Sequence, residues 1–390
     1  MGSEQALVIG LTSFAIAVLL VITGGWHERW TGDFENSGVQ KHHRGSPPRI
    51  GVLPILVALL LGVYLLSSGH SRASQDASRL LALMLAASLP VVLLGFADDV
   101  TKKVPPRMRL LGAIAAGALA IALLGIRVVR VDIPLIDSLV AFVPVSVVIT
   151  LLMVGGFTNA MNIVDGLNGL ASGLALLMLG ATAFVAARFG DTLVLDLCVV
   201  LAMAVGGFFL VNFPRGGMFL GDGGAYLIGF LLVQIWMLLL SRNPGITAWM
   251  VMAIAFQPTM ETIFSIYRRR FRSGRSGAMS ADRLHLHSLV YRRRTRTLAS
   301  QWPWLESWVA NAGAAVIVVG FGAVPMVAAA LAPSSTAWAL VVICTSVGVY
   351  LTWFRRMVTV RARRRAAVDA AVGKLPESSA PSSEPTGAKP

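Results

Sequence analysis

The chain has 390 residues, of which 56% are hydrophobic and only 13% are charged. A soluble globular domain carries roughly 25% charged residues, so this composition excludes an ordinary soluble protein and indicates a membrane protein. The formal net charge is +14, but the Lys and Arg residues gather in a few loops and in the C-terminal tail. That pattern favours loops facing anionic lipid over a nucleic-acid partner.

Apolar runs that approach the length of a bilayer recur along the chain. A transmembrane helix needs about 20 apolar residues. The first run lacks a positively charged start and a small-residue cleavage site, so we expect a retained membrane helix and not a signal peptide. Because backbone groups in lipid must be satisfied within a segment, the predicted fold is all-α, a polytopic membrane protein with about eleven transmembrane helices. The predicted spans are 5–25, 50–68, 78–96, 110–126, 138–157, 170–187, 192–211, 221–241, 246–266, 307–331 and 336–354.

The Lys and Arg residues divide unevenly between the two sides that these spans define. The loops after odd-numbered spans, together with the C-terminal segment, carry 27 of the 33, and the other side carries 6. The positive-inside rule therefore predicts an N-terminus outside and a C-terminus in the cytoplasm. We expect one transmembrane domain over 1–355, followed over 356–390 by a cytoplasmic tail that is first basic and then disordered.

Acidic residues gather on the predicted cytoplasmic side, at the ends of spans that are far apart in sequence. Asp98 and Asp99 end the third span, and Asp165, Asp222 and Asp282 lie in or beside later loops of the same side. Charges at membrane depth are costly and are functional candidates by default. A solvated loop charge is the alternative for any single one of them.

Asp98 and Asp99 are two like charges placed side by side where water screens their repulsion poorly. A bound divalent cation would relieve that repulsion, and Mg²⁺ favours one or two carboxylates together with substrate phosphates. Zinc is less favoured, because His285 and His287 are two residues apart and no cysteine lies near them.

The stretch TNAMNIVDGLNGLASG (158–173) places a polar side chain at every third residue. Helical spacing puts such neighbours on one face, where amides and a carboxylate suit a ligand with both donors and acceptors. Hydrogen bonding between helices of the bundle is the structural alternative. The residues in question are Asn159, Asn162, Asp165 and Asn168.

Two later stretches carry chemistry that suits phosphates. In NFPRGGMFLGDGGAYLIG (212–229), glycines surround Asp222 at the start of a span, where a helix N-terminus favours an anion. The loop 267–306 carries ten arginines, whose guanidinium groups bind phosphates through two parallel hydrogen bonds. The positive-inside rule explains many of these arginines, but it does not explain the segment DRLHLHSL at 282–289.

Together with KHHRGSPPRIG (41–51) and GFADD (95–99), these stretches resemble the polyprenyl-phosphate N-acetylhexosamine-1-phosphate transferases of glycosyltransferase family 4. The resemblance covers roughly 33–290 and follows the order of that family's motifs. It implies a bacterial inner-membrane enzyme that moves an N-acetylhexosamine 1-phosphate from a UDP-sugar to undecaprenyl or another polyprenyl phosphate and releases UMP. It also implies Mg²⁺ as the cofactor, with Mn²⁺ as a substitute.

The resemblance further implies roles for individual residues. Asp98 and Asp99 would lie by the lipid phosphate, and one of them would take its proton. Asp222 and Asp98 would hold the metal ion, and Asp165 completes the expected catalytic set. The uridine would be held by Asp165, Asn168, Asn212 and Phe219. The full set of expected substrate-binding residues is Lys41, Asn159, Asn162, Asn168, Asn212, Phe219, Arg268, Asp282, His285 and His287.

The chain departs from the common family pattern at three positions. Asn168 stands where many members have Asp, Ala225 where many have Ser, and Ser288 where the common-antigen enzymes tend to have His. The last loop also lacks the His-His-x-x-Glu run of the peptidoglycan branch, which argues against a muramoyl-pentapeptide substrate. The subgroup that starts O-antigen or another surface polysaccharide is favoured.

Two other functions stay open at this point, a peptidoglycan-precursor transferase and a secondary transporter. Transporters place their charges near the membrane midplane, whereas the acids here gather toward one surface. The expected partners are a UDP-N-acetylhexosamine, a polyprenyl phosphate and the membrane, without nucleic acid. A homodimer is left open.

Overall fold

The computed structural model describes residues 1–32, 47–69, 71–272, 284–295 and 307–372. These residues are helical apart from short connections and one isolated β-bridge between Gly32 and Pro48, so the all-α prediction is confirmed. The chain divides into two compact units, Met1–Val347 and Gly348–Pro390. The helices in chain order are α1 (Ser3–Ile22), α2 (Gly24–Thr31), α3 (Val52–Ser67), α4 (Arg72–Thr101), α5 (Pro106–Leu124), α6 (Pro134–Val140), α7 (Val143–Val164), α8 (Leu170–Arg188), α9 (Thr192–Asn212), α10 (Gly221–Arg242), α11 (Ala248–Ile254), α12 (Phe256–Arg272), α13 (Leu286–Val290), the π-helix η1 (Tyr291–Thr295), α15 (Ser307–Leu331) and α16 (Thr336–Val372).

Within the part of the chain that the structure describes, nine helices are long and apolar enough to cross a membrane. This finding confirms a polytopic membrane protein. The predicted span at 50–68 forms the shorter helix α3, which has 16 residues. The nine helices are α1, α4, α5, α7, α8, α9, α10, α15 and the first part of α16.

The predicted span at 246–266 is interrupted at Ala255, where α11 ends and α12 begins. Pro258 lies in the first turn of α12. A proline has no backbone N–H, so it could not donate to the carbonyl of Ile254 in one continuous helix. A proline is tolerated in the first turn of a new helix, which fits the observed interruption.

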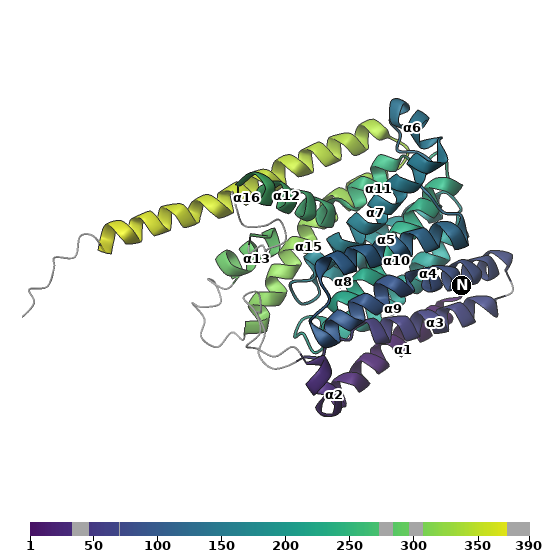
Figure 1. Ribbon diagram of the computed structural model, residues 1–390, viewed down its shortest axis with the longest axis horizontal. Coiled ribbons are helices and arrows are strands. Elements are labelled where there is room, and N and C mark those ends of the chain that lie inside the picture. The colour runs from purple at the N-terminus through teal and green to yellow at the C-terminus, as the bar shows by residue number, and fades with distance from the viewer. Residues whose placement is uncertain (33–46, 70, 273–283, 296–306, 373–390) are drawn as a thin grey trace, which may run out of the picture. The chain divides into compact units, whose positions relative to one another are not determined.

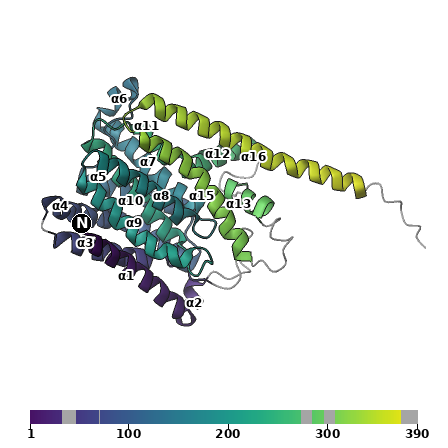
Figure 2. The same cartoon turned by 180° about the vertical axis from the view of Figure 1, so that it is seen from behind.

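Helix α10 is the central helix of the first unit. It packs against α4 and α7 and also contacts α3, α5, α8 and α9. All of its residues from Gly221 to Leu239 are buried. Figures 1 and 2 view the molecule from opposite sides, and both show α10 surrounded by neighbouring helices. A helix that is apolar all round must be buried in protein or lipid, and here protein covers it.

The helices around α10 keep large apolar side chains exposed. Examples are Leu60 on α3, Leu93 on α4, Leu152 on α7 and Leu210 on α9. Such exposure is expected of a membrane protein, because lipid tails cover these positions.

Four helix ends meet at one end of the bundle. The last turn of α4 and the first turns of α5 and α10 carry charged residues that contact one another, and α7 ends in Asp165 beside the start of α10. Segments separated by more than 100 residues therefore supply charged groups to one place.

Candidate active site

Three carboxylates and two guanidinium groups meet where α4, α5 and α10 come together. Arg109 Nη1 donates to Asp98 Oδ2 at 2.8 Å and also to Asp222 Oδ2. Arg49 Nη2 lies 3.2 Å from Asp222 Oδ1 and 3.5 Å from Asp99 Oδ1. We call Asp98, Asp99 and Asp222 the acid cluster. The cluster and its two arginines carry a formal charge of −1, so the carboxylates are not fully neutralised.

Asp99 caps α10 from a different helix. Its Oδ1 accepts the N–H of Asp222 at 2.8 Å, and its Oδ2 accepts the N–H of Gly223 at 2.9 Å. The first N–H groups of a helix have no partner within that helix, and the helix dipole makes this end attractive to a negative charge. The α10 sequence supplies no side-chain cap of its own. Asp99 is 1% exposed, so its carboxylate is committed to this cap.

Asp98 is in a different position from its neighbour. Its Oδ1 accepts the Val104 N–H at 2.9 Å, and its Oδ2 accepts from Arg109. The Asp98 side chain is 16% exposed, whereas the Asp99 side chain is 0% exposed. Of the two adjacent aspartates, Asp98 is therefore the one that a ligand can reach.

Glycines allow α4 and α10 to approach closely enough for this cap. A Cβ atom at Gly95 would lie 2.7 Å from both Cα and N of Gly223. Gly221 has a φ of +74°, in the left-handed region that favours glycine. A Cβ atom there would lie 2.5 Å from Asp99 Oδ2. Both positions therefore require glycine if the carboxylate is to reach the helix end.

Arg49 is held by a short segment that pairs with the loop before α10. The Phe219 N–H donates to the Pro48 carbonyl at 2.9 Å, and the Gly51 N–H donates to the Phe219 carbonyl at 3.0 Å. The predicted ligand residue Phe219 thus anchors Arg49 through its backbone, while its side chain remains partly exposed.

Asp165 joins the site from the end of α7. The pKa of Asp165 is raised to about 7, because burial disfavours the charged carboxylate and the negative charge of Asp222 adds to this effect. Arg49 and the Gly221 N–H favour the charged form and oppose this rise. Asp165 therefore lies within electrostatic reach of both the acid cluster and Arg49.

Two of the predicted asparagines connect the turn after α7 to the loop before α10. Asn212 Oδ1 accepts the Gly169 N–H at 2.6 Å, and Asn212 Nδ2 donates to the Met218 carbonyl at 2.7 Å. Asn168 Nδ2 donates to the Pro214 carbonyl at 3.1 Å. Both side chains are buried, so in this structure they hold the two loops together.

The other two asparagines of the periodic stretch lie on α7, one and two turns before Asp165. Asn159 Nδ2 donates to the Gly155 carbonyl at 2.7 Å, within its own helix. Asn162 is partly exposed, and its carbonyl accepts the Asp165 N–H at 3.2 Å. No contact between either side chain and the acid cluster is seen among the described residues.

A second polar group lies on α12, on the segment before α13 and in the first turn of α13. Glu261 accepts the Leu286 N–H at 3.1 Å and contacts His285 Nδ1 at 3.3 Å. The rings of His285 and His287 stack, with centroids 5.4 Å apart. Arg268 is buried, donates to the Leu284 carbonyl and lies over the Phe264 ring.

His287 connects this second group to the first. A Cβ atom at Gly166 would lie 2.5 Å from His287 Nε2, so the imidazole lies directly against the backbone that follows Asp165. The predicted residues His285 and His287 therefore lie on the same side of the bundle as Asp165. The predicted residues Lys41 and Asp282 lie outside the described residues.

The sequence gives a family assignment that fits this geometry. Residues 81–240 match the sequence family described as glycosyl transferase family 4. The chain belongs to glycosyl transferase family 4. The matched residues include the whole acid cluster, Arg109 and Asp165, whereas Arg49 and the histidine pair lie outside them.

Several relatives within this family carry names that describe one reaction. The Bacillus subtilis (strain 168) protein named probable undecaprenyl-phosphate N-acetylglucosaminyl 1-phosphate transferase is 27% identical over 257 residues, which cover 66% of this chain and 69% of that protein. The Mycobacterium leprae decaprenyl-phosphate N-acetylglucosaminephosphotransferase is 30% identical, over 63% of this chain and 66% of that protein. The Yersinia pestis undecaprenyl-phosphate alpha-N-acetylglucosaminyl 1-phosphate transferase is 35% identical, over 38% of this chain and 42% of that protein.

The chain thus spans about two thirds of the length of the first two relatives. The arginines Arg49 and Arg109 are the residues that our reasoning from the sequence did not single out. Arg49 falls in the quoted stretch KHHRGSPPRIG, and Arg109 lies in the first turn of α5, the helix that follows the paired aspartates.

Within the described part of this family member, no three His, Cys, Asp or Glu side chains are arranged as an all-protein metal site. Mg²⁺ does not need one, because it binds through one or two carboxylates together with substrate phosphates and water. In the acid cluster, Asp98 Oδ2 and Asp222 Oδ2 already converge on one cation, the guanidinium of Arg109. The donor chemistry of this pair therefore fits a magnesium ion.

Proposed function

We propose that this family 4 protein transfers N-acetylglucosamine 1-phosphate from UDP-N-acetylglucosamine to a polyprenyl phosphate and releases UMP. The names of the relatives support the two substrates. The observation that carries the chemistry is the convergence of Asp98, Asp99 and Asp222 with Arg49 and Arg109 at one end of a transmembrane bundle.

The reaction is a phosphoryl transfer between two anions. An oxygen of the lipid phosphate attacks the phosphorus that carries the sugar, and the bond from this phosphorus to the oxygen shared with the UMP phosphate breaks. UMP leaves with that oxygen, and a sugar-diphospho-lipid stays in the membrane. The second pKa of a phosphate monoester is about 6, so the attacking oxygen is already charged near neutral pH. Bringing the two anions together is therefore the main electrostatic cost.

Arg49 and Arg109 would reduce this cost. Arginine forks bind phosphates through paired hydrogen bonds, and fixed positive charges stabilise the charge that spreads in the transition state. Their side chains are 28% and 21% exposed, so both guanidiniums are within reach of a ligand while the aspartates hold them in place.

The two adjacent aspartates would divide their work. Asp99 would fix the N-terminus of α10 and, with it, the position of Asp222. Asp98, which is partly exposed, would lie beside the lipid phosphate and receive its proton when the phosphate arrives as a monoanion. Asp98 then acts on a reacting group, and Asp99 is a positioning residue.

A magnesium ion would be held by Asp98 and Asp222, with the phosphates of the nucleotide sugar completing its ligands. When bound, such an ion neutralises charge on the diphosphate and helps the leaving phosphate to depart. Arg109 also donates to the same two carboxylates, and we infer that its guanidinium would turn toward the phosphates when the substrates bind.

The second polar group would hold the diphosphate and the sugar. His287 lies against Gly166, next to Asp165 in the chain, and Glu261 fixes the segment that carries His285 and His287. Arg268 donates to the carbonyl of Leu284 in the same segment. Lys41, Asn159, Asn162 and Asp282 are further proposed contacts. Asn168 and Asn212 would act on the uridine mainly by holding the loop that carries Phe219.

We also propose the location of the reaction. The polyprenyl chain is confined to the membrane and the nucleotide sugar is made in the cytosol, so the acid cluster should face the cytoplasm of a bacterial inner membrane, with the N-terminus outside. The product would start an O-antigen-like or other surface polysaccharide. Labelling of single cysteines placed at residues 69 and 103 with a membrane-impermeant thiol reagent tests the orientation, because only the former should react in intact cells.

The activity is tested with purified protein, undecaprenyl or decaprenyl phosphate, Mg²⁺ and a panel of UDP-sugars. We expect UMP release and a lipid-linked product with UDP-N-acetylglucosamine, and loss of both when the metal is chelated. UDP-N-acetylgalactosamine and UDP-N-acetylmuramoyl-pentapeptide complete the panel. Turnover only with the pentapeptide would overturn the proposed donor and favour the peptidoglycan branch. No UMP release with any UDP-sugar, together with substrate flux in liposomes, would favour a transporter.

A further inference from the structure

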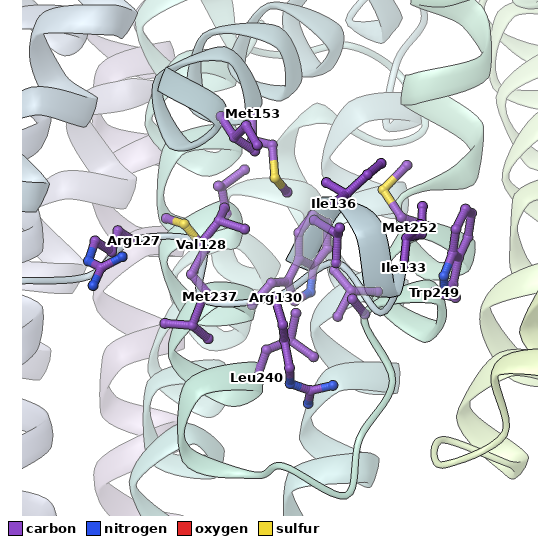
Figure 3. Close-up of a pocket in the computed structure, with 17 residues that line it drawn as sticks. Arg127, Val128, Arg130, Ile133, Ile136, Met153, Met237, Leu240, Trp249 and Met252 are labelled. Carbon is purple, nitrogen blue, oxygen red and sulfur yellow. The ribbon is translucent and has the colours of Figure 1, made fainter. Parts of the chain in front are cut away.

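A cavity of about 330 Å³ lies at the other end of the bundle from the acid cluster. It is lined by the loop between α5 and α6, by α6 itself, by the first half of α7, the last half of α10 and helix α11 (Figure 3). Met237 lines it and lies fifteen residues after Asp222 on α10, which is about 22 Å along the helix axis. A bilayer core is about 30 Å thick, so the cavity belongs to the opposite leaflet.

The lining of the cavity is almost entirely apolar. Of the 17 lining residues, only Arg127 and Arg130 are charged, and the other fifteen are aliphatic residues, methionines or tryptophans. The indole N–H groups of the two tryptophans are already used, because Trp236 donates to Thr182 and Trp249 donates toward the Asp132 carbonyl. The walls therefore offer a hydrocarbon ligand contacts and offer a polar ligand almost none.

The two arginines at the edge differ in how they are bound. Arg130 donates to Asp132 at 2.5 Å and to the carbonyls of Asn243 and Ile246, so it is committed to the protein. Arg127 has no acidic partner among the residues that the structure describes. Figure 3 shows the nitrogen-bearing ends of both side chains turned away from the apolar side chains. Arg127 thus presents a free positive charge beside an apolar cavity.

The surroundings of the cavity face lipid. Val148 and Leu152 on α7 flank the lining residues Ile149 and Met153, and both are more than half exposed. Leu139 on α6 is similarly exposed. A ligand can therefore enter from the bilayer without passing through water.

We propose that this cavity holds an acyl chain of an anionic phospholipid of the opposite leaflet, with the lipid phosphate paired to Arg127. The positive charge of Arg127 is complementary to a lipid phosphate, and the apolar lining of the cavity is complementary to an acyl chain. A basic residue near a membrane surface attracts an anionic headgroup by about 1 kcal/mol, which corresponds to about fivefold in affinity. The inference is independent of the proposed activity, because no residue of the acid cluster takes part.

The test measures retention of phosphatidylglycerol by the full-length protein in detergent, with native mass spectrometry after delipidation and titration. Phosphatidylcholine serves as the zwitterionic comparison. We expect one tightly bound phosphatidylglycerol, about fivefold weaker binding in Arg127→Gln, and no change in Arg188→Gln. Arg188 is the matched control, because it ends α8 and its contacts among the described residues are the α15 carbonyls of Ala330 and Leu331 and the Phe184 ring.

A second variant, Met153→Trp, fills the cavity from a partly exposed position on α7 and should reduce binding of both lipids. Thermal unfolding of each variant in detergent shows whether it is folded. Equal retention of phosphatidylglycerol by the wild type, Arg127→Gln and Met153→Trp would overturn the proposal. Displacement of the bound phospholipid by polyprenyl phosphate at equal concentration would overturn the choice of occupant.

Discussion

The two ends of the bundle both pair aspartates with arginines, but they do so differently. At the end away from the acid cluster, Asp191 is a single carboxylate that accepts from Arg242 Nε at 2.8 Å, Asn243 Nδ2 at 2.9 Å and the Val194 N–H at 3.2 Å. In the acid cluster, three carboxylates share two arginines. The first arrangement is saturated and neutral, and the second keeps an excess of negative charge. Asp191 and its partners therefore stabilise the fold, whereas the acid cluster, with its excess negative charge, is suited to binding a cationic ligand.

The largest expected effect is at the centre of the acid cluster. Asp222→Asn should lower turnover at least about 100-fold, the size of effect seen when one preorganised electrostatic contact is lost, and should weaken the dependence on Mg²⁺. UMP release measured against Mg²⁺ concentration tests this. Asp76→Asn is the control, because Asp76 is exposed on α4 at the other end of the bundle. Wild-type rates at limiting Mg²⁺ would contradict the role of Asp222.

The next largest effect is expected when an arginine of the acid cluster is replaced, compared with an arginine at the other end of the bundle. Arg109→Gln should lower turnover about 10- to 100-fold, because a guanidinium that bridges two carboxylates and reaches the phosphates is lost. Arg130→Gln, which removes the charged partner of Asp132, should reduce thermal stability, and the folded variant should keep its turnover. Initial rates and unfolding temperatures of the two variants separate these effects. Equal loss of turnover in both would show that the two ends do not differ as described.

A smaller effect is expected for the saturated pair. Burial alone would raise the pKa of Asp191. The hydrogen bonds from Arg242, Asn243 and Val194 lower it by a larger amount, so the net shift is downward. This stabilisation is present above the unfolded pKa near 4 and is lost as the pH falls through the lower folded value. Asp191→Asn should cost about 1–3 kcal/mol at neutral pH and reduce the loss of stability in acid. Unfolding temperatures across pH 3–7 in detergent test this, and a steeper acid loss in the variant would contradict it.

The smallest effect concerns Asp165, whose pKa is shifted in the opposite direction, to about 7. The folded state favours the protonated form of Asp165. Its contribution to the free energy of unfolding is therefore fully present below pH 4 and is lost as the pH rises to about 7. Without Mg²⁺ and substrate, Asp165→Asn should flatten the fall in unfolding temperature between pH 4 and 7. Asp137→Asn, outside the site, should leave that slope unchanged. An unchanged slope in Asp165→Asn would contradict the raised pKa of Asp165.

Much of the fold could be predicted because lipid imposes a simple rule on length and polarity. The apolar runs predicted the long helices, and the positions of Asp98, Asp99 and Asp222 at helix ends predicted that they would meet. The break at Ala255 was missed, although Pro258 is the residue that signals it. Hydropathy is averaged over a window of about 19 residues, so one proline inside an apolar run is easily overlooked.

The partners of the acids could not be predicted from the pattern alone. The positive-inside rule gave Arg49 and Arg109 a sufficient explanation as loop charges, so neither was assigned a role, although Arg49 falls in the quoted stretch KHHRGSPPRIG. Their contacts with Asp222 join residues 173 and 113 positions apart, and only folding creates such contacts. Asn168 was predicted as a ligand residue from the periodic polar stretch and the family resemblance, and Asn212 from the resemblance alone. Their amides also suit the backbone of two loops, which is where they bond.

The crossing of α4 and α10 at Gly95 and Gly223 has a consequence for any engineering of this protein. The backbones of the two aspartate-bearing helices are in direct contact here, because neither glycine has a Cβ atom. A Cβ atom at Gly95 would lie 2.7 Å from the Gly223 backbone. Adding one methyl group there would wedge the helices apart and pull the Asp99 carboxylate away from the amides it caps, without altering a single charged group. The position of the Asp99 carboxylate therefore depends on glycine, which has no side chain, at both Gly95 and Gly223.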